Sequence, residues 1–197
     1  MRRALGPAAL LAMAVALGAC ALPESAEPDG FTGGEAPTLI PDVPFVMSHE
    51  PVVAAMLDLA GVGPGDILYD LGCGEGRIVI AAAQRGARGV GIDIDRHPLY
   101  FAQRYARRAG VEERVRFVRG NFFDADLKEA TVVALYLSPE INLRLLPKLL
   151  AELSPGSRIV SNRFDMGSAW KPDREARAGD HSVFLWVVPA DKRVQPR

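Results

Sequence analysis

The sequence has 197 residues, 49% of them hydrophobic, and its 23 basic and 24 acidic side chains give a formal net charge of −1. This length predicts one domain and a tail, and a core of that size needs no disulfide bonds. The balanced charge excludes a broad basic face for nucleic acid, so we expect no nucleic-acid partner. The arginines between positions 104 and 119 are interpreted as a solvated helix face.

The N-terminus has the pattern of an export signal. Two arginines precede the apolar run 8–17, which is too short to span a bilayer as a helix. Residues 17–20, Leu-Gly-Ala-Cys, resemble the bacterial lipobox, in which the cysteine is lipidated and becomes the first residue of the mature protein. We therefore predict a signal peptide over 1–19 and an exported protein, anchored by a lipid on Cys20 to the periplasmic or outer face of the cell envelope. An ordinary cleaved signal with an accidental cysteine is the alternative.

Residues 20–43 are rich in Pro, Gly, Glu and Ser and have no apolar periodicity, which predicts a flexible tether. A tether of this length reaches about 25–30 Å on average. We predict the folded domain over 44–190 and a tail over 191–197. If Cys20 carries lipid, Cys73 has no disulfide partner, and we assign it no chemistry.

Within the domain, apolar strand patterns alternate with helical ones. Ser48 is expected to cap the first helix and Gly61 to stop it, Pro98 to open the third helix, and Pro147 to kink or split the fourth. The predicted helices lie at 49–60, 78–85, 98–109 and 139–153. The predicted strands lie at 67–71, 89–94, 115–119, 131–137, 157–161 and 183–188.

The most informative segment is 69–77, Tyr-Asp-Leu-Gly-Cys-Gly-Glu-Gly-Arg, between the first strand and the second helix. Such a turn presents backbone N–H groups and the positive end of a helix to a ligand, and glycine permits positive φ and close approach. A dinucleotide fingerprint requires G-x-G-x-x-G, whose third glycine would fall at Arg77. The spacing therefore disfavours a nicotinamide-dependent oxidoreductase.

The pattern D-x-G-x-G-x-G at 70–76 resembles the first motif of class I S-adenosylmethionine (SAM)-dependent methyltransferases. The resemblance implies SAM as cofactor. It also implies an α/β fold with a Rossmann-like, doubly wound, seven-stranded sheet, mostly parallel with a terminal antiparallel strand. The alternation of strands and helices agrees with such a sheet, and its ligands sit at the carboxyl ends of the strands.

The resemblance also assigns roles to the residues of the cofactor site. Asp70 would hold the cationic methionine end of SAM, and the backbone of Gly72, Gly74 and Gly76 would pack against its methionine and ribose portions. Asp93, at the end of the second strand, would accept hydrogen bonds from the ribose hydroxyls; a solvated strand end or a helix cap is its alternative role.

The adenine side of the predicted site departs from the family pattern. After the third strand the family commonly has an acidic residue near the adenine amino group, and the matching position here is Asn121, whose carbonyl oxygen can still accept a hydrogen bond. Phe122 would line the adenine or simply belong to the core, and Asp124 is a weaker candidate. Asp95 is expected to be a local helix cap. We expect no metal.

Over roughly 42–188 the chain looks most like the group of mitochondrial protein-lysine methyltransferases that modify the adenine nucleotide translocase and the ATP synthase c subunit. The segments that carry this resemblance are 44–46, 50–53, 69–80, 135–139, 142–143, 147–149, 158–161 and 164–167. By this resemblance the acceptor is a protein lysine, whose amine must lose a proton before it attacks, and an apolar pocket lowers its pKa.

Two residues after the fourth strand are candidate catalytic residues. Glu140 would orient the amine and Tyr136 would contact it through its hydroxyl; a helix N-terminal acid and a core tyrosine are the alternatives. Asp165 and Trp170 would shape the acceptor entrance. The competing function is a non-catalytic, exported nucleoside-binding or structural envelope lipoprotein. Its support is that SAM is made in the cytoplasm, so an exported enzyme would lack an obvious supply. The acceptor's identity and the oligomeric state do not follow from the sequence.

Overall fold

The computed structural model describes residues 48–191. The predicted signal peptide, the lipid site at Cys20, the tether and nearly all of the predicted tail lie outside the described residues. The domain boundaries at 44 and 190 therefore stay predictions.

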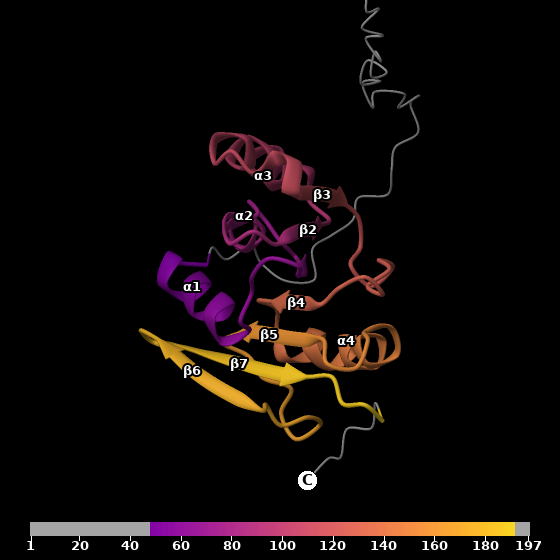
Figure 1. The fold of residues 1–197 in the computed structure, drawn as a ribbon. Helices are drawn as coiled ribbons and strands as arrows, with labels where there is room; N and C mark the ends of the chain where they lie inside the picture. The colour runs from indigo at the N-terminus through magenta and orange to yellow at the C-terminus, as the bar shows by residue number, and fades with distance from the viewer. Residues whose placement is uncertain (1–47, 192–197) are drawn as a thin grey trace, which may run out of the picture. The chain divides into compact units, whose positions relative to one another are not determined.

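The domain is built on a seven-stranded sheet with the order β3-β2-β1-β4-β5-β7-β6 (Figure 1). The strands are β1 (Ile67–Leu71), β2 (Arg88–Asp93), β3 (Val115–Arg119), β4 (Val132–Leu135), β5 (Arg158–Asn162), β6 (Arg174–Ala178) and β7 (His181–Val187). Neighbours from β3 to β5 are parallel, and β7 is antiparallel to both β5 and β6. The predicted sheet, mostly parallel with an antiparallel end, is confirmed.

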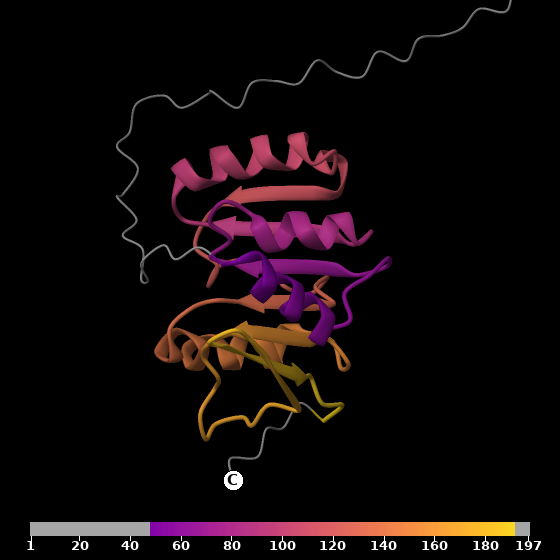
Figure 2. The same ribbon diagram turned by 90° about the vertical axis from the view of Figure 1, so that its left-hand side faces the viewer.

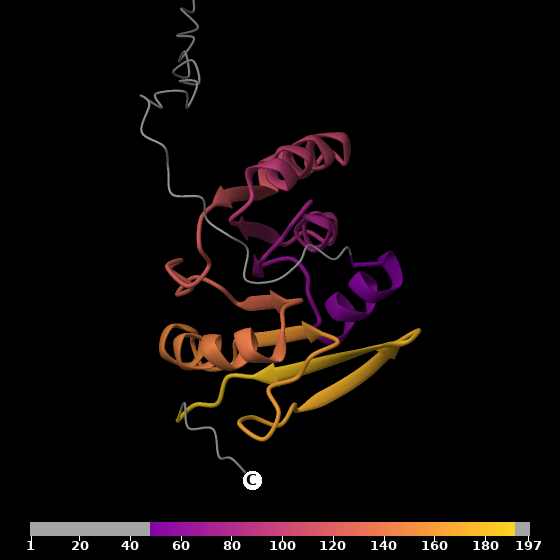
Figure 3. The ribbon, with the colours of Figure 1, turned by 180° about the vertical axis from the view of Figure 1, so that it is seen from behind.

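Helices cover both faces of the sheet. They are α1 (Glu50–Leu59), α2 (Arg77–Gln84), α3 (Arg96–Arg108) and α4 (Pro139–Glu152), with a short 3-10 turn, Glu112–Arg114. Figure 1 shows the sheet edge-on with α1, α2 and α3 on one side, and Figure 3 shows α4 and the non-helical connection from β3 to β4 on the other. Among residues 48–191 no helix has the length and apolar character needed to cross a membrane.

Each face of the sheet has its own core, because successive residues of a strand point to opposite faces. Leu68, Ala134 and Val160 pack with α1 and α2 in the first core cluster. Their neighbours Tyr69, Leu135 and Ile159 pack with α4 in the second. Every residue of β4 is buried, as expected for a central strand covered on both sides.

The expected cap of the first helix is wrong, and the fourth helix is not split. His49, not Ser48, precedes α1, and its side chain makes no capping hydrogen bond; Pro51 in the first turn, whose φ is fixed near the helical value, favours this start. Pro147 does not split α4, which runs through it as one helix. Leu145 and Leu149, fully buried on either side of the proline, hold both halves on the sheet.

The predictions missed strand β6. Its sequence, Arg-Glu-Ala-Arg-Ala, is charged and lacks β-branched residues, because it is an edge strand that pairs only with β7 and exposes most of its side chains. Gly179, with φ of 64°, and Asp180 form the two-residue connection between them. This Gly-Asp pair is a typical hairpin turn and was the available signal.

A polar network closes the amino edge of the sheet. The Arg158 guanidinium pairs with the Asp66 carboxylate and donates from Nη1 to the Ala60 carbonyl oxygen at 2.7 Å. Thr131 Oγ1 donates to Asp66 Oδ1 at 2.7 Å, and the Gly63 amide donates to Oδ2 at 3.0 Å. Burial opposes ionisation, but these hydrogen bonds and the Arg158 charge hold the pKa of Asp66 below its ordinary value.

Candidate cofactor and acceptor site

The glycine loop between β1 and α2 requires glycine at its alternate positions. Gly72, Gly74 and Gly76 have φ of 81°, 52° and 74°, a region that other residues rarely adopt. A Cβ on Gly76 would lie 2.5 Å from Phe117 Cε1, and one on Gly72 would lie 3.2 Å from Leu137 Cδ2. Positive φ at these glycines, expected from the sequence, is therefore observed, and Gly76 also permits packing against β3.

Hydrogen bonds fasten this loop to the end of β2. The amides of Gly72 and Cys73 donate to the Ile92 carbonyl oxygen at 2.8 and 3.0 Å, and the Gly74 amide donates to Asp93 Oδ2 at 2.7 Å. Asp93 Oδ1 accepts from the Asp95 amide at 2.9 Å. The carboxylate of Asp93 is half-buried and keeps further lone pairs for ribose hydroxyls, so its predicted role fits this geometry.

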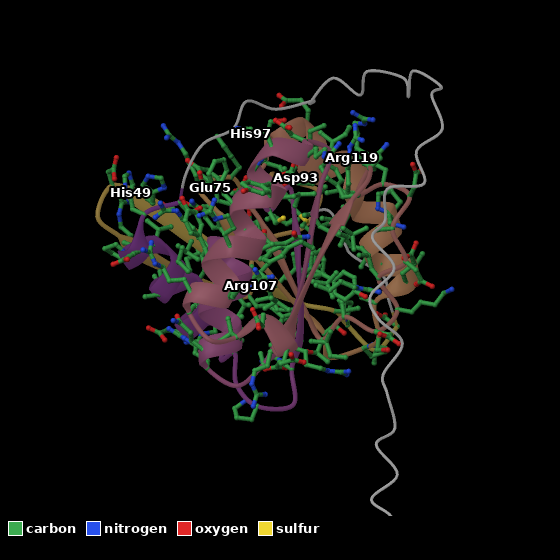
Figure 4. All side chains as sticks on the ribbon, turned by 90° about the horizontal axis from the view of Figure 1, so that it is seen from above. His49, Glu75, Asp93, His97, Arg107 and Arg119 are labelled. Atoms are coloured by element: carbon green, nitrogen blue, oxygen red, sulfur yellow. The ribbon has the colours of Figure 1, made fainter. Side chains whose placement is uncertain are left out.

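The predicted helix cap at Asp95 is confirmed: its Oδ1 accepts from the His97 amide at 2.9 Å at the start of α3. Figure 4 shows Asp93 and His97 at this end of α3, with Glu75 of the glycine loop toward the same end and Arg107 at the other. The loop, the end of β2 and the start of α3 thus meet at the carboxyl edge of the sheet, where ligands of such folds bind.

Asp70 lies beneath this loop with only 3% of its surface exposed. Burial, together with the negative charge of Asp93, raises the pKa of Asp70 to about 8. The two carboxyl groups share a face of the sheet, because Asp70 pairs with Gly91, two residues before Asp93. A cationic ammonium group would offset both effects, so the residues present fit the methionine end of SAM.

The surroundings of Cys73 disfavour a chemical role for its thiol. Its thiol is buried, and a Cβ placed on Gly91 would lie 2.7 Å from its Sγ. Burial, with the nearby charges of Asp70 and Asp93, raises the pKa of the Cys73 thiol, so the reactive thiolate is disfavoured.

The predicted adenine residues form a compact turn after β3. Asn121 Oδ1 accepts from the Phe123 amide at 3.0 Å, so the oxygen assigned to the adenine already orders the loop. Phe122 is half-buried, with its ring 4.9 Å from that of Phe123, and packs against the second core cluster. Asp124 is exposed. Adenine contacts by Asn121 and Phe122 stay predictions.

The two candidate catalytic residues have different surroundings. Tyr136 is half-buried just beyond β4, with its ring 6.1 Å from the His181 ring in an edge-on arrangement. Glu140 is exposed in the first turn of α4, where hydrogen bonds from its own amide and from Ser138 lower the pKa of its carboxyl. Tyr136 therefore lies beside His181, while the interactions of Glu140 are those of a helix N-terminal acid.

The predictions also missed polar residues beside Tyr136. Asn162, fully buried at the end of β5, has its Oδ1 2.8 Å from His181 Nδ1 at the start of β7. On the opposite face Asn142 of α4 donates to the Phe164 carbonyl oxygen at 3.2 Å. Asn162 and His181 are 19 positions apart in the sequence, and the segment between them includes the unpredicted strand β6, so no sequence motif brought them together.

The two residues expected at the acceptor entrance differ in burial. Asp165 is half-buried and its Oδ1 accepts from the Gly167 amide at 3.0 Å. Trp170 is buried in the second core cluster, where its carbonyl oxygen accepts from Trp186 Nε1 at 2.9 Å. Within residues 48–191 no group of His, Cys, Asp and Glu side chains is arranged to hold a metal ion.

Comparison with known proteins decides the family. The family model described as the ANTKMT methyltransferase domain matches residues 70–174, just over half of the chain. The chain belongs to this family. A protein-lysine N-methyltransferase of Saccharolobus islandicus (strain REY15A) is 41% identical to it over 159 residues, which cover 78% of this chain and 98% of that protein.

Two further relatives extend the comparison. The adenine nucleotide translocase lysine N-methyltransferase of Mus musculus is 34% identical over 147 residues, 74% of this chain and 63% of that enzyme. The crystal structure of an RNA methyltransferase from Salinibacter ruber, in complex with S-adenosyl-L-homocysteine (SAH), is 46% identical. It aligns with a TM-score of 0.74 over 77% of this chain and 99% of that one.

These findings confirm the predicted class I fold, the predicted enzyme class and the predicted cofactor. The chain is a SAM-dependent methyltransferase, and its glycine loop, Asp70 and Asp93 lie where that cofactor binds in such folds. The competing function as a non-catalytic envelope lipoprotein finds no support in these relatives. The contacts of individual residues with the cofactor stay predictions.

Proposed function

We propose that this methyltransferase transfers a methyl group from SAM to the ε-amine of a lysine in a protein. The Saccharolobus relative, a protein-lysine N-methyltransferase, is spanned almost completely by this chain. The mouse enzyme that methylates lysine of the adenine nucleotide translocase is spanned over 63% of its length.

The observation that carries this proposal is the position of Tyr136 beside the cofactor residues. Ala134 pairs with Asp70 across β4 and β1, and Tyr136 lies two residues further along the same face. Asp93, Asp70 and Tyr136 therefore follow one another on three neighbouring strands at the carboxyl edge. An amine beside Tyr136 would face the methionine end of a cofactor held by Asp70.

The reaction needs alignment more than acid–base chemistry. SAM, when bound, supplies a methyl group on a positively charged sulfur. The amine lone pair forms the C–N bond while the C–S bond breaks and its electron pair stays on sulfur, so the positive charge moves to the methylated amine. The protein's part is to hold both partners in line and to exclude water. In this proposal Asp70 and the glycine loop hold the cofactor, and Tyr136 contacts the amine.

A second acceptor class must be tested, because the Salinibacter neighbour is called an RNA methyltransferase. The formal net charge of −1 favours a protein acceptor over a polyanion. Labelling experiments can separate the two directly.

The test is to incubate the full chain with methyl-tritiated SAM and an extract of the source organism, then digest protein and RNA separately. We expect the label in methylated lysine, identified by mass spectrometry of the protein digest. Asp93→Ala should abolish this label, whereas Glu113→Ala, an exposed residue of the 3-10 turn Glu112–Arg114 with no role in the site, should retain it. Label in nucleosides, or no transfer at all, would overturn the proposal.

We also propose that the enzyme is exported and anchored to the cell envelope through a lipid on Cys20. The support is the sequence of the segment 1–20, with its basic start, apolar run and Leu-Gly-Ala-Cys end. Metabolic labelling with a radioactive fatty acid should mark the wild-type protein and leave Cys20→Ser unlabelled. Equal labelling of both proteins, or none of the wild type, would contradict the anchor.

A further inference from the structure

We propose that His181, held by Asn162, is a positioning residue that accepts a hydrogen bond from the acceptor amine. The inference rests on the proposed amine methylation and adds to it a residue on β7 that neither sequence motif nor relative assigns. It starts from a polar cluster formed by Tyr136, Asn162 and His181. We call these three residues the acceptor cluster.

The acceptor cluster continues the row of cofactor residues along the carboxyl edge. Beyond β1, the next strands are β4, β5 and β7 (Figure 1). Tyr136 directly follows the end of β4, Asn162 ends β5 and His181 begins β7. Alternation puts all three on the face that carries Asp70. Tyr136 and Asn162 lie two residues after Ala134 and Val160, and His181 two before Val183, and those three residues pack in the first core cluster.

The hydrogen bond to Asn162 fixes what His181 can offer. Nδ1 lies 2.8 Å from the amide oxygen Oδ1, which only accepts, so Nδ1 carries the proton. In the neutral ring Nε2 is then a hydrogen-bond acceptor. The side chain of His181 is only 12% exposed, so this acceptor is largely shielded from water.

Asn162 is itself unusual. It is fully buried, and its Nδ2 has no hydrogen-bond partner among the residues that the structure describes. A buried amide that serves only as a core filler would leave this donor at a cost, and such groups in folded proteins are seldom left unmatched. The amide oxygen of Asn162, at 2.8 Å from His181 Nδ1, orients the imidazole, and this contact gives the buried amide a role beyond filling the core.

A neutral amine matches the acceptor cluster in number and kind of hydrogen bonds. It has two N–H donors and one lone pair. If His181 Nε2 accepts one N–H and the Tyr136 oxygen the other, the lone pair remains free to form the C–N bond. The strand order places the cofactor residues beside Tyr136, so the free lone pair would face the side on which the cofactor is held.

A competing charge partner for His181 is weak. Asp180 Oδ1 lies 3.8 Å from Nε2, but its side chain is 95% exposed, and such pairs contribute little. Asp180→Asn is therefore a matched control, because it alters the residue next to His181 without changing the acceptor cluster.

The test compares two ligands that differ at the reacting centre. SAH lacks the methyl group, whereas sinefungin replaces the sulfur and its methyl with a carbon bearing a primary amine. Calorimetry on the full chain would measure both affinities for wild type, His181→Ala, His181→Gln, Asn162→Ala and Asp180→Asn. The ratio of the two affinities reports on the amine and needs no acceptor protein.

We expect His181→Ala to weaken sinefungin about tenfold while changing SAH less than twofold, which is the loss expected for one hydrogen bond to a charged group. His181→Gln should recover part of the wild-type preference for sinefungin over SAH, since the glutamine amide oxygen can accept a hydrogen bond. The affinity ratio of Asn162→Ala should lie between those of His181→Ala and the wild type. Asp180→Asn should keep the wild-type ratio.

An unchanged ratio in His181→Ala, or an equal loss for both ligands, would overturn the role of His181 and indicate a structural one. Failure of the proposed function would give a different result. The wild-type protein would then bind neither SAH nor sinefungin, which would contradict the cofactor site itself. Transfer of label from SAM to poly-L-lysine gives a second readout, in which His181→Ala should raise KM for the polymer without changing SAM affinity.

Discussion

At the scale of single residues, Asp70 destabilises the ligand-free protein and is expected to strengthen binding of the cofactor. Its carboxyl is buried beside the charge of Asp93, and the pKa of Asp70 rises to about 8. Ionising it without a cation nearby costs free energy, and a bound ammonium group would return that energy as affinity. The residue is therefore better suited to the liganded protein than to the free one.

This pKa predicts how the stability of the ligand-free protein depends on pH. The folded pKa lies above the ordinary value of 3.8, so between these values the folded state binds more protons than the unfolded state. The free energy of unfolding should then fall as pH rises from about 4 to about 8, by up to about 1.4 kcal/mol per unit.

Asp70→Asn should flatten this dependence and stabilise the free protein at pH 9, while abolishing SAH binding. Urea unfolding at pH 5, 7 and 9 measures the first effect, and calorimetry the second. Asp66 does not confuse the comparison, because its lowered pKa confines its titration to more acidic conditions. If the free energy of unfolding depended on pH in the same way in wild type and Asp70→Asn, the raised pKa of Asp70 would be contradicted.

Gly76 illustrates a second constraint at this scale, since both its φ and its packing forbid a side chain. Gly76→Ala should destabilise the protein by about 2–4 kcal/mol, from about 1 kcal/mol for the left-handed backbone and the rest for overpacking against Phe117. Gly156→Ala is the control, since its φ is 86° but nothing lies within 4 Å of its Cβ. Urea unfolding of both variants should show a clear difference; equal losses would mean that the clash with Phe117 is relieved.

At the scale of elements, prediction succeeded where one strand's own residues decide its position. β1 and β3 begin and end at the predicted residues. β1 is a short, mostly apolar run that ends at a glycine loop, and β3 has valine and phenylalanine at three of its five positions and is followed by Gly120. β6 was missed because an edge strand is charged and its pairing with β7 is decided by tertiary contact. The start of β7 was placed two residues late for the same reason.

Arg158 joins several elements at the amino edge, since it contacts Asp66 before β1 and the carbonyl oxygen that ends α1. Arg158→Met should lower the free energy of unfolding at pH 7 by about 2 kcal/mol, because it leaves a partly buried carboxylate without its cation. Arg158→Lys, which keeps the charge but not both hydrogen bonds, should lose less.

Arg158→Met should also change how the free energy of unfolding depends on pH in acidic solution. The pKa of Asp66 is depressed, so its contribution is present above the ordinary value of 3.8 and is lost as pH falls through the folded pKa. Without Arg158 this loss below about pH 4 should be smaller. Thermal unfolding between pH 3 and 7 would measure this loss of stability. The same loss in Arg158→Met as in wild type would show that the hydrogen bonds from Thr131 and Gly63 alone lower the pKa of Asp66.

At the scale of the whole molecule, the contiguous part of the site could be predicted and the assembled part could not. Asp70 and the glycines share one motif, and Asp93 follows at the end of the next strand, so sequence order places them together. His181 and Asn162 meet only after β7 turns back against β5, across a hairpin that the pattern did not reveal. The cofactor half of such a fold is therefore easier to predict than the acceptor half.

The central claim is that the carboxyl edge formed by Asp70, the glycine loop and Asp93 binds SAM. Calorimetric titration of SAH into the full chain tests it most directly, with Asp93→Ala as the site variant and Glu113→Ala as the exposed control. We predict saturable binding to wild type and Glu113→Ala, and at least a tenfold loss in Asp93→Ala, since the ribose hydroxyls would lose charge-assisted hydrogen bonds. No binding at millimolar SAH, or the same affinity in Asp93→Ala as in wild type, would contradict the claim.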